Sequence, residues 1–356
     1  MLEAPTRCLV AFLLFLAPRG CTGAPGMLNQ TFLPDSTRDL PMIRKLFPLV
    51  LLLAFGGWLA AQPDSWQAHT APVHHLAFSP DGKLLVSAGF DNLAKVWSWP
   101  EGKEVRALTG HTGPVYCATF SPDGKLIATC SVDKTIRLWN PADAKLVREI
   151  KGHTEIVDGV AFSPDGKLLA SASSDKSVRL WNVADGKEVK NLGVHGGNAY
   201  GVAFSKDGKM LASISGDPDK LIKLWSIADM KSAKDLKGHT ASVTGVVFLP
   251  DNTKVASIGH DRMVRLWNVA DGKEIAAMGP TPDDLYGLAL SPDGKKLATS
   301  GYAGNVAVWD TDTKKQLFTR KVPQFGAYCI TWSPDGQKLL TGHDKQVILV
   351  TPAKAP

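Results

Sequence analysis

The chain has 356 residues, 44% of them hydrophobic and 21% charged, which excludes a disordered chain and one embedded in a membrane throughout. Its net charge is +6. Residues 1–61 hold five basic and three acidic side chains, so residues 62–356 hold 35 basic and 31 acidic ones. This small excess is too weak for the basic surface that nucleic-acid binding requires, and we expect no nucleic-acid partner.

The segment 42–61, MIRKLFPLVLLLAFGGWLAA, has the arrangement of a signal peptide. Arg44 and Lys45 precede an uncharged apolar run, which ends in small residues before Gln62. We expect cleavage after Ala61 and export to the periplasm, the cell surface or the medium. An uncleaved membrane tether is the alternative, although the 16 uncharged residues of 46–61 are fewer than the roughly 20 that span a bilayer.

A second apolar stretch lies upstream, at residues 8–17. Two signal-like stretches in succession are unusual, and a translation start at Met42 instead of Met1 would explain them. We therefore assign residues 1–61 to an N-terminal targeting region and residues 62–356 to a folded domain.

One four-residue turn, Ser-Pro-Asp-Gly or a close variant, recurs seven times in this domain. The copies begin at Ser79, Ser121, Ser163, Ser205, Leu249, Ser291 and Ser333, in steps of 42, 42, 42, 44, 42 and 42 residues. A repeat of this length is typical of the blades of a β-propeller. The spacing predicts an all-β fold with seven blades.

Each unit is expected to form a four-stranded antiparallel sheet. In the second unit, residues 110–150, the Ser-Pro-Asp-Gly turn joins two β-rich runs, since Pro presets one φ angle and Gly tolerates a positive φ. Two further tight connections, at 131–134 and 141–144, lead to the third and fourth strands. Neither face of such a sheet is consistently polar, so neighbouring sheets must cover both faces.

Five units also contain His, Ser or Thr, Asp and Trp at matching positions. These sets are His69, Ser87, Asp91 and Trp97; His111, Thr129, Asp133 and Trp139; His153, Ser171, Asp175 and Trp181; His195, Ser213, Asp219 and Trp225; and His239, Ser257, Asp261 and Trp267. The interval from His to Trp is 28 residues in four sets and 30 in the fourth, which has an insertion near Asp217 and Pro218.

With these motifs the domain resembles the WD40 family of seven-bladed β-propellers across residues 69–350. The resemblance implies that each set forms a hydrogen-bonded structural network. A buried His, Asp and indole N–H satisfy one another, where one left alone would cost about 1–3 kcal/mol.

The last two units depart from this pattern. The sixth has Gly279–Pro280 where His is expected and Ala303 where Asp is expected. The seventh keeps Asp344, lacks the His, and has Val350 in place of the Trp. We expect blades six and seven to be the looser part of the ring.

The seventh unit has no room for a fourth strand of its own, because only six residues follow Val350. Alignment of Ala68–His69 with Gly110–His111 puts residues 64–67 in the place of a fourth strand. We therefore expect the N-terminal strand to close the last blade, which removes an exposed sheet edge.

Catalytic and metal-binding patterns are absent from the sequence. Five of the nine histidines belong to the sets above, and His74 and His75 are adjacent in a strand, so they point to opposite faces. No nucleophile elbow, P-loop or HExxH motif occurs. Cys117, Cys130 and Cys329 show no regular spacing, and we interpret them as small buried residues. We expect no cofactor, no metal and no enzymatic activity.

Binding is better supported, by one position early in the innermost strand of every unit. It is occupied by His74, Tyr116, Asp158, Tyr200, Thr244, Tyr286 and Tyr328. Four of the five tyrosines of the chain fall here, and the position should lie near the mouth of the central channel. Tyr offers rigid area and a hydroxyl group, which suits recognition of a peptide or protein. The alternative is that these rings only pack between blades.

The WD40 resemblance implies that this face is a docking surface. We therefore interpret the domain as a monomeric, non-enzymatic scaffold for a protein or peptide partner. Two alternatives remain open: a propeller enzyme of the lactonase type, which shares the Ser-Pro-Asp-Gly hairpins, and an exported sensor of a ligand or glycan.

Overall fold

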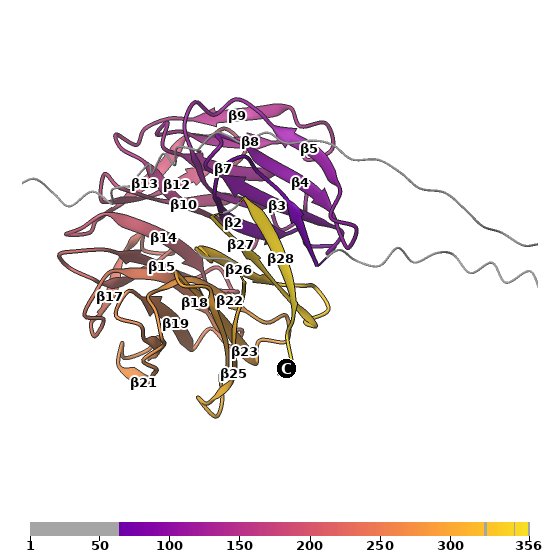
Figure 1. Cartoon of the computed structure of the whole chain (residues 1–356). Helices are drawn as coiled ribbons and strands as arrows, with labels where there is room; N and C mark the ends of the chain where they lie inside the picture. The colour runs from indigo at the N-terminus through magenta and orange to yellow at the C-terminus, as the bar shows by residue number, and fades with distance from the viewer. Residues whose placement is uncertain (1–63, 324–325, 345, 355–356) are drawn as a thin grey trace, which may run out of the picture. The chain divides into compact units, whose positions relative to one another are not determined.

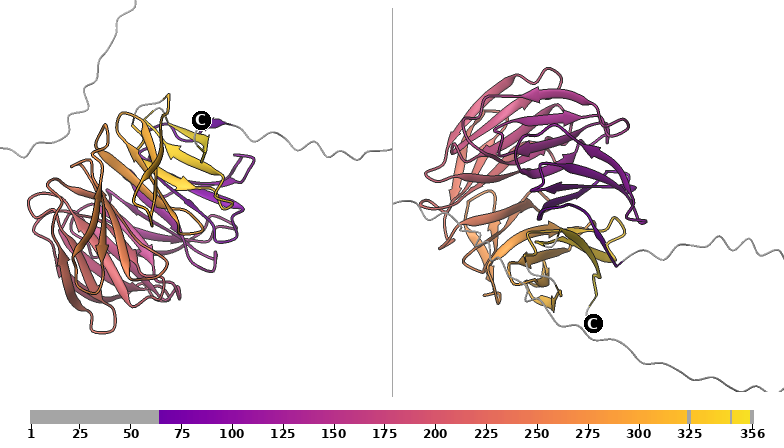
Figure 2. Two further views of the ribbon diagram at one scale, coloured as in Figure 1. Left: turned by 90° about the horizontal axis from the view of Figure 1, so that it is seen from below. Right: turned by 45° about the horizontal axis from the view of Figure 1, so that its top comes forward.

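The computed structural model describes residues 64–323, 326–344 and 346–354. They form an all-β structure of seven four-stranded antiparallel sheets, as the sequence predicts (Figure 1). The innermost strands of successive sheets contact one another in turn, and that of the last sheet contacts that of the first, so the sheets close into a ring (Figure 2). The signal-peptide-like segment 42–61 and its expected cleavage site lie outside the described residues.

Each sheet is one blade. Blades one to three contain β2 (Val73–Phe78), β3 (Leu84–Gly89), β4 (Ala94–Ser98), β5 (Glu104–Leu108), β6 (Val115–Phe120), β7 (Ile127–Ser131), β8 (Ile136–Trp139), β9 (Leu146–Ile150), β10 (Val157–Phe162), β11 (Leu168–Ser173), β12 (Ser177–Asn182) and β13 (Glu188–Val194). Blades four and five contain β14 (Ala199–Phe204), β15 (Met210–Ser215), β16 (Ile222–Ser226), β17 (Lys231–Leu236), β18 (Val243–Phe248), β19 (Lys254–Gly259), β20 (Val264–Asn268) and β21 (Glu274–Met278). Blades six and seven contain β22 (Leu285–Leu290), β23 (Lys296–Gly301), β24 (Asn305–Asp310), β25 (Gln316–Lys321), β26 (Cys329–Trp332), β27 (Lys338–Gly342), β28 (Val347–Pro352) and, as the fourth strand of blade seven, β1 (Ser65–Gln67).

The first strand of the domain completes the last blade, which confirms the expected closure. β1 pairs antiparallel with β28, with Ser65 opposite Leu349 and Gln67 opposite Val347. The amide of Val350 donates to the carbonyl of Asp64 at 2.8 Å. The outer edge of β28 is therefore paired by the opposite end of the domain.

The hairpin between the first two strands of each blade is built by its own side chains. In blade three, Ser163 Oγ donates to Asp165 Oδ1 at 2.6 Å and accepts from the amide of Leu168 at 2.9 Å. Gly166 has a φ of +70°, a conformation that costs a side chain strain. Ser and Asp therefore stabilise the turn whose spacing defines the repeat.

The hydrophobic core lies between neighbouring blades. One cluster combines Val86 and Val96 of blade one with Ile127 and Trp139 of blade two, all of them buried. Each sheet thus buries its faces against the next, because no blade has a second layer of its own.

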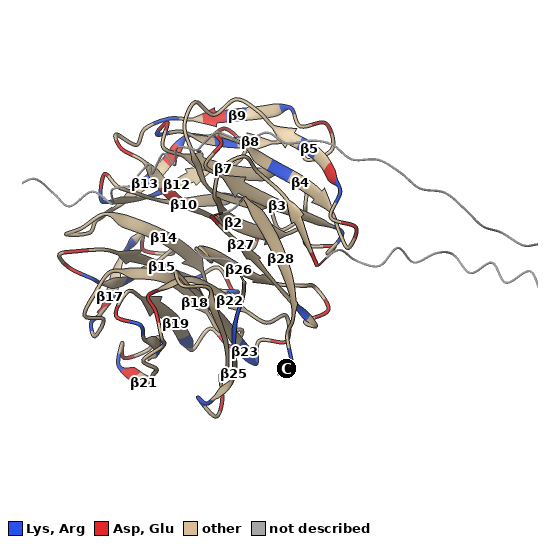
Figure 3. Ribbon diagram, in the orientation of Figure 1, with Lys and Arg blue, Asp and Glu red and all other residues tan. Residues whose placement is uncertain are grey.

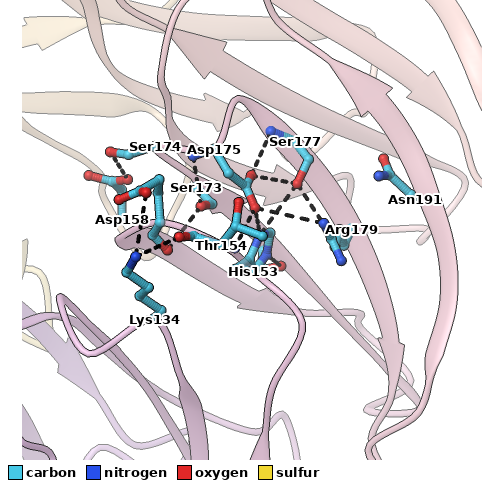
Figure 4. Close-up of polar contacts among 12 residues, drawn as sticks. Lys134, His153, Thr154, Asp158, Ser173, Ser174, Asp175, Ser177, Arg179 and Asn191 are labelled. Atoms are coloured by element: carbon cyan, nitrogen blue, oxygen red, sulfur yellow. Dashed lines mark hydrogen bonds and ion pairs between the residues drawn. The ribbon is translucent and has the colours of Figure 1, made fainter.

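A hydrogen-bonded chain ties the strands of blade three together. Trp181 Nε1 donates to Ser171 Oγ at 2.8 Å, and Ser171 Oγ lies 2.7 Å from His153 Nε2. The other ring nitrogen, Nδ1, lies 2.8 Å from the carboxylate of Asp175 (Figure 4). Because an ionised carboxylate only accepts, Nδ1 carries the ring hydrogen and donates it to Asp175, and Nε2 of the neutral ring accepts the hydrogen of Ser171 Oγ. Burial lowers the pKa of His153, in keeping with this neutral ring.

The same three bonds join the sets of blades one, two and five. Those sets are His69, Ser87, Asp91 and Trp97; His111, Thr129, Asp133 and Trp139; and His239, Ser257, Asp261 and Trp267.

Blade four keeps only part of this network. His195 and Trp225 both bond to Ser213, at 2.7 and 2.8 Å, but His195 Nδ1 lies 3.5 Å from Asp219 and has no hydrogen-bond partner among the described residues. Asp219 instead accepts from the amides of Gly196 and Gly197. The two-residue insertion before Asp219 displaces its carboxylate, so the expected His–Asp hydrogen bond is wrong for this blade.

Blade six lacks both the His and the Asp of the network, and an aspartate from a different loop takes the place of the Asp. Thr281, two residues after Gly279, stands where the other blades have His. Asp283 accepts from the amide of Ala303 at 2.5 Å and from Asn305 Nδ2 at 3.2 Å. The turn that lacks its own Asp is therefore held by a carboxylate from the preceding loop.

The register of blade seven corrects two of its assignments. Thr351 lies opposite Leu339, as Trp309 lies opposite Leu297, so Thr351 and not Val350 stands at the Trp position. By the 42-residue period Asp344 is equivalent to Tyr302, and the true Asp position, 345, lies outside the described residues.

A different histidine bonds to the hydroxyl group of blade seven. His343 is fully buried, and its Nε2 lies 2.7 Å from Thr341 Oγ1. Thr341 is equivalent to Ser171 of blade three. His343, however, directly follows β27, the second strand of its blade, whereas His153 lies in the loop before the first strand of its blade. Blade seven therefore keeps a His–Thr pair that the repeat alignment does not reveal.

Replacement of Ser171 by Ala tests the network. It would leave the indole N–H of Trp181 and Nε2 of His153 buried without a partner. We expect the free energy of unfolding, measured by urea titration, to fall by about 2–4 kcal/mol.

Ser300→Ala is the matched control, because Ser300 is equally buried on β23 but its hydroxyl has no hydrogen-bond partner in the part of the chain that the structure describes. This variant should be as stable as the parent, or slightly more stable. Equal losses for the two variants would show that the effect comes from packing and not from the hydrogen bonds.

Candidate binding site at the channel mouth

Seven residues, one from each blade, line a single cavity of about 200 Å³ on the axis of the ring. They are His74, Tyr116, Asp158, Tyr200, Thr244, Tyr286 and Tyr328. Six of them lie in the innermost strands, and Tyr328 directly precedes β26. The position singled out in the sequence is therefore brought together from all seven blades.

A second ring of residues, missed in the sequence, stands beside the first. It lies 16 positions later in every unit, just past the second strand, and consists of Phe90, Val132, Ser174, Gly216, His260, Tyr302 and Asp344. Because the second strand runs antiparallel to the first, its end returns to the same end of the blade. The signal that could have revealed this ring is the constant spacing of 16.

Aromatic rings from both positions meet at blades one and two. His74 stacks on Phe90 with ring centroids 5.0 Å apart, and both contact Tyr116, at 4.7 and 5.1 Å. His74 Nδ1 also lies 2.9 Å from the carbonyl oxygen of Tyr116, which fixes the ring against the next blade.

A second aromatic group occupies blades five to seven. Tyr286 lies 4.7 Å from His260, 6.1 Å from Tyr302 and 5.7 Å from Tyr328, measured between ring centroids. Tyr302 is 51% exposed, so the group reaches the outer surface. His74 is 6.1 Å from Tyr328, which joins the two groups into one arc. We call these seven residues, Phe90, Tyr116, His74, Tyr328, Tyr286, Tyr302 and His260, the aromatic arc.

The opposite side of the mouth is polar. Asp158 accepts a hydrogen bond from Ser174 Oγ at 2.9 Å (Figure 4), and it is the only carboxylate among the described residues that line the cavity. Burial raises the pKa of Asp158 to about 7. Thr244 Oγ1 donates to the carbonyl of Leu285 at 2.7 Å. The cavity therefore offers one carboxyl group that changes charge near neutral pH.

Two further contacts hold the tyrosines in place. Tyr328 donates its hydroxyl hydrogen to Asp344 at 2.6 Å; burial and this bond raise the pKa of Tyr328. Gly216 packs so close to Tyr200 that an added Cβ would lie 2.6 Å from the Tyr200 ring. The two rings are thus fixed by their partners 16 residues later and present preset surfaces.

Among the residues of the two rings at the mouth, only Asp158 and Asp344 carry a carboxyl group, and none is Lys or Arg. Lys and Arg, together with Asp and Glu, lie mainly on outer strands and connecting loops, with both signs interspersed (Figure 3). In residues 64–323, 326–344 and 346–354, no three His, Cys, Asp or Glu side chains are placed to hold a metal ion. The site is therefore suited to stacking and hydrogen bonding.

The comparison with known families agrees with this architecture. The model of the WD domain, G-beta repeat (WD40), matches seven segments: residues 62–98, 102–140, 144–182, 186–226, 230–268, 273–310 and 314–350. The chain belongs to the WD40 repeat family. Each matched segment begins with the fourth strand of one blade and continues through the third strand of the next blade, so the seven segments together cover the seven blades.

Similarity to individual curated proteins is confined to about one repeat. The chain is 54% identical over 35 residues to ribosome assembly protein 4 of Saccharomyces cerevisiae, which is 10% of this chain and 7% of that protein. It is 47% identical over 38 residues to ribosome assembly protein 4 of Chaetomium thermophilum, again 7% of that protein. These short matches reflect the repeat motif.

The described part of the WD40 chain contains no helix that is long and apolar enough to cross a bilayer.

The raised pKa of Asp158 predicts a dependence of stability on pH. Between about pH 4 and pH 7 the folded protein holds a proton on Asp158 that the unfolded chain releases. The stabilisation is present below the unfolded pKa and is lost as the pH rises through about 7. We therefore expect Asp158→Asn to gain stability relative to the parent between about pH 5 and pH 8, in urea titrations.

Asp165→Asn serves as the control. The hydrogen bond that Asp165 accepts from Ser163 lowers the pKa of Asp165, so this carboxylate stays ionised from about pH 5 to pH 8. Its replacement should change stability by the same amount at both pH values. A pH-independent difference for Asp158→Asn would contradict the assignment of a neutral carboxyl group at the mouth.

Proposed function

We propose that this WD40 propeller is a non-enzymatic scaffold that docks a peptide segment of a partner protein at the channel mouth. WD40 propellers typically serve as platforms for protein interactions, and the proposal assigns that role to one face of the ring. The observation that carries it is the aromatic arc, in which rings from blades one, two, five, six and seven form one continuous surface.

The arc has the properties of a recognition surface. Aromatic side chains contribute large contact areas at low cost in conformational entropy, and they dominate the binding energy of many interfaces. Here the rings of His74 and Tyr328 are additionally held by hydrogen bonds, so little ordering has to accompany binding.

Polar groups beside the arc would set the orientation of the bound segment. His260 Nε2 is buried without a hydrogen-bond partner among the described residues, and it lies in the arc beside Tyr286. A donor or acceptor on the peptide would satisfy it, which would favour ligands with a polar group at that point.

A random peptide library displayed against the full chain tests this proposal. We expect selected peptides to lose at least about 10-fold in affinity, by calorimetry, when Tyr302 or Tyr286 is replaced by Ala. Replacement of Tyr116, Tyr200, Tyr286 and Tyr328 together should abolish binding.

Leu146→Ala provides the control, because Leu146 is 45% exposed on the outer strand β9 and lies outside the cavity. Circular dichroism and thermal unfolding establish that each variant is folded. The proposal fails if no peptide is selected, or if folded variants of the arc bind selected peptides as tightly as the parent.

A further inference from the structure

We propose that Cys117 and Cys130 form a dithiol in blade two that is reversibly oxidised to a cross-strand disulfide by thiol–disulfide exchange, with His75 of blade one as the base for Cys117. This site lies deeper in the channel than the arc and does not depend on the proposed peptide binding.

The two cysteines are directly opposed. Cys117 on β6 pairs with Cys130 on β7, next to a bulge between Val115 and Cys117. Directly opposed residues of antiparallel strands have Cα atoms about 4.5–5.5 Å apart, which lies within the range of about 4.4–6.8 Å found across disulfides. Both thiols are free in this structure. A disulfide could therefore form without moving the strands apart.

This coincidence is peculiar to blade two. The positions equivalent to Cys117 in blades three to six are Gly159, Gly201, Gly245 and Gly287, and those equivalent to Cys130 are Ala172, Ile214, Ile258 and Ser300. In blade seven Cys329 lies opposite Gly342. Two small apolar residues would suffice for packing at these positions, so a facing pair of thiols calls for another explanation.

His75 lines the same cavity as Cys117 and keeps one ring nitrogen as a base. Its Nδ1 lies 3.0 Å from the carbonyl oxygen of Ala118. A carbonyl can only accept, so Nδ1 carries the hydrogen and Nε2 keeps its lone pair. In this structure the Cys117 thiol donates to the carbonyl oxygen of Val160 at 3.8 Å, and the neighbouring His75 is one of the groups that favour its ionised form. We therefore assign Nε2 of His75 as the acceptor of the thiol proton when Cys117 ionises.

The two thiols differ in their readiness to ionise. A hydrogen bond from Cys130, aided by the neighbouring His75, lowers the pKa of Cys117 well below that of an ordinary thiol, against the effect of burial. Burial, followed by the interaction with Cys117, raises the pKa of Cys130. Cys117 is therefore the nucleophile and Cys130 the resolving thiol.

Of the two thiols in blade two, only that of Cys117 faces the channel, where Cys329 of blade seven also lines the cavity. Cys117 and His75 line the cavity, whereas Cys130 does not and is fully buried. A small disulfide that enters the cavity would therefore meet the thiolate of Cys117 first.

The oxidant is a low-molecular-weight disulfide, RSSR. Cys117 Sγ gives its proton to His75, attacks one sulfur of RSSR and breaks its S–S bond, and the departing thiolate takes the proton from His75 as RSH. Cys130 then attacks Cys117 Sγ in the mixed disulfide, and its proton leaves with the second RSH. Two thiols of the protein are oxidised and one RSSR is reduced to two RSH.

The test incubates the reduced full chain with cystamine, followed by alkylation in denaturant and peptide mapping by mass spectrometry. We expect Cys117 and Cys130 to become linked to each other and protected from alkylation, and dithiothreitol to restore both. Cys329→Ala should behave like the parent.

Two variants separate the roles of the thiols. Cys130→Ala, which introduces the residue found at the equivalent positions 88 and 172, should stop at a cysteamine adduct on Cys117. Cys117→Ala should leave Cys130 unmodified. An adduct on Cys130 in that variant, or full alkylation of Cys117 and Cys130 in the parent after incubation, would overturn the proposal.

The role of His75 as a positioned base needs its own measurement. His75→Gln keeps a donor for the Ala118 carbonyl but removes the base, and we expect the adduct on Cys117 in the Cys130→Ala background to form about 10²-fold more slowly. An unchanged rate in a variant with unchanged thermal stability would overturn the assignment of His75.

Discussion

The structure depends on one constraint: a four-stranded sheet with two apolar faces is stable only when both faces and its edges are covered. Each blade covers its neighbour, so the arrangement is complete only if the last blade meets the first. β1 supplies this closure by pairing with β28, and Trp66 packs 6.0 Å from Trp97 of the first blade, measured between ring centroids. Backbone hydrogen bonds thus join the two ends of the domain, and an aromatic contact packs the closing strand against blade one.

The same closure creates the candidate site. Because the ring places seven innermost strands around one axis, a residue at one repeat position appears seven times at the channel mouth, and its partner 16 positions later appears beside it. The Trp, Ser or Thr, and His chains stiffen the sheets behind that mouth. The channel itself then presents an aromatic arc at its rim and, in blade two, the thiol of Cys117, which is opposed by the buried Cys130.

Much of this architecture could be predicted from the sequence, because the period of the hairpin turn and the four-residue sets are local patterns that geometry repeats faithfully. The closing strand followed from the same alignment. The departures in blades four, six and seven could not be predicted, because in each a residue from another part of the fold, or a displaced one, takes over a position of the repeat. Asp283 of blade six comes from a different loop, and His343 of blade seven replaces a histidine of the preceding loop. In blade four the insertion before Asp219 moves its carboxylate away from His195, and sequence spacing does not reveal how far. The second ring was missed because a contact such as that of His74 with Phe90 requires knowing where the hairpin ends.

Amide hydrogen exchange in the intact chain tests closure most directly. Val350 of β28 donates to Asp64 beside β1, and by the repeat period it corresponds to Val308 of β24, an interior strand of blade six. If β1 closes the ring, β28 should be protected to the same degree as β24. Fast exchange along β28 while β24 stays protected would show an open edge in blade seven and would contradict this account.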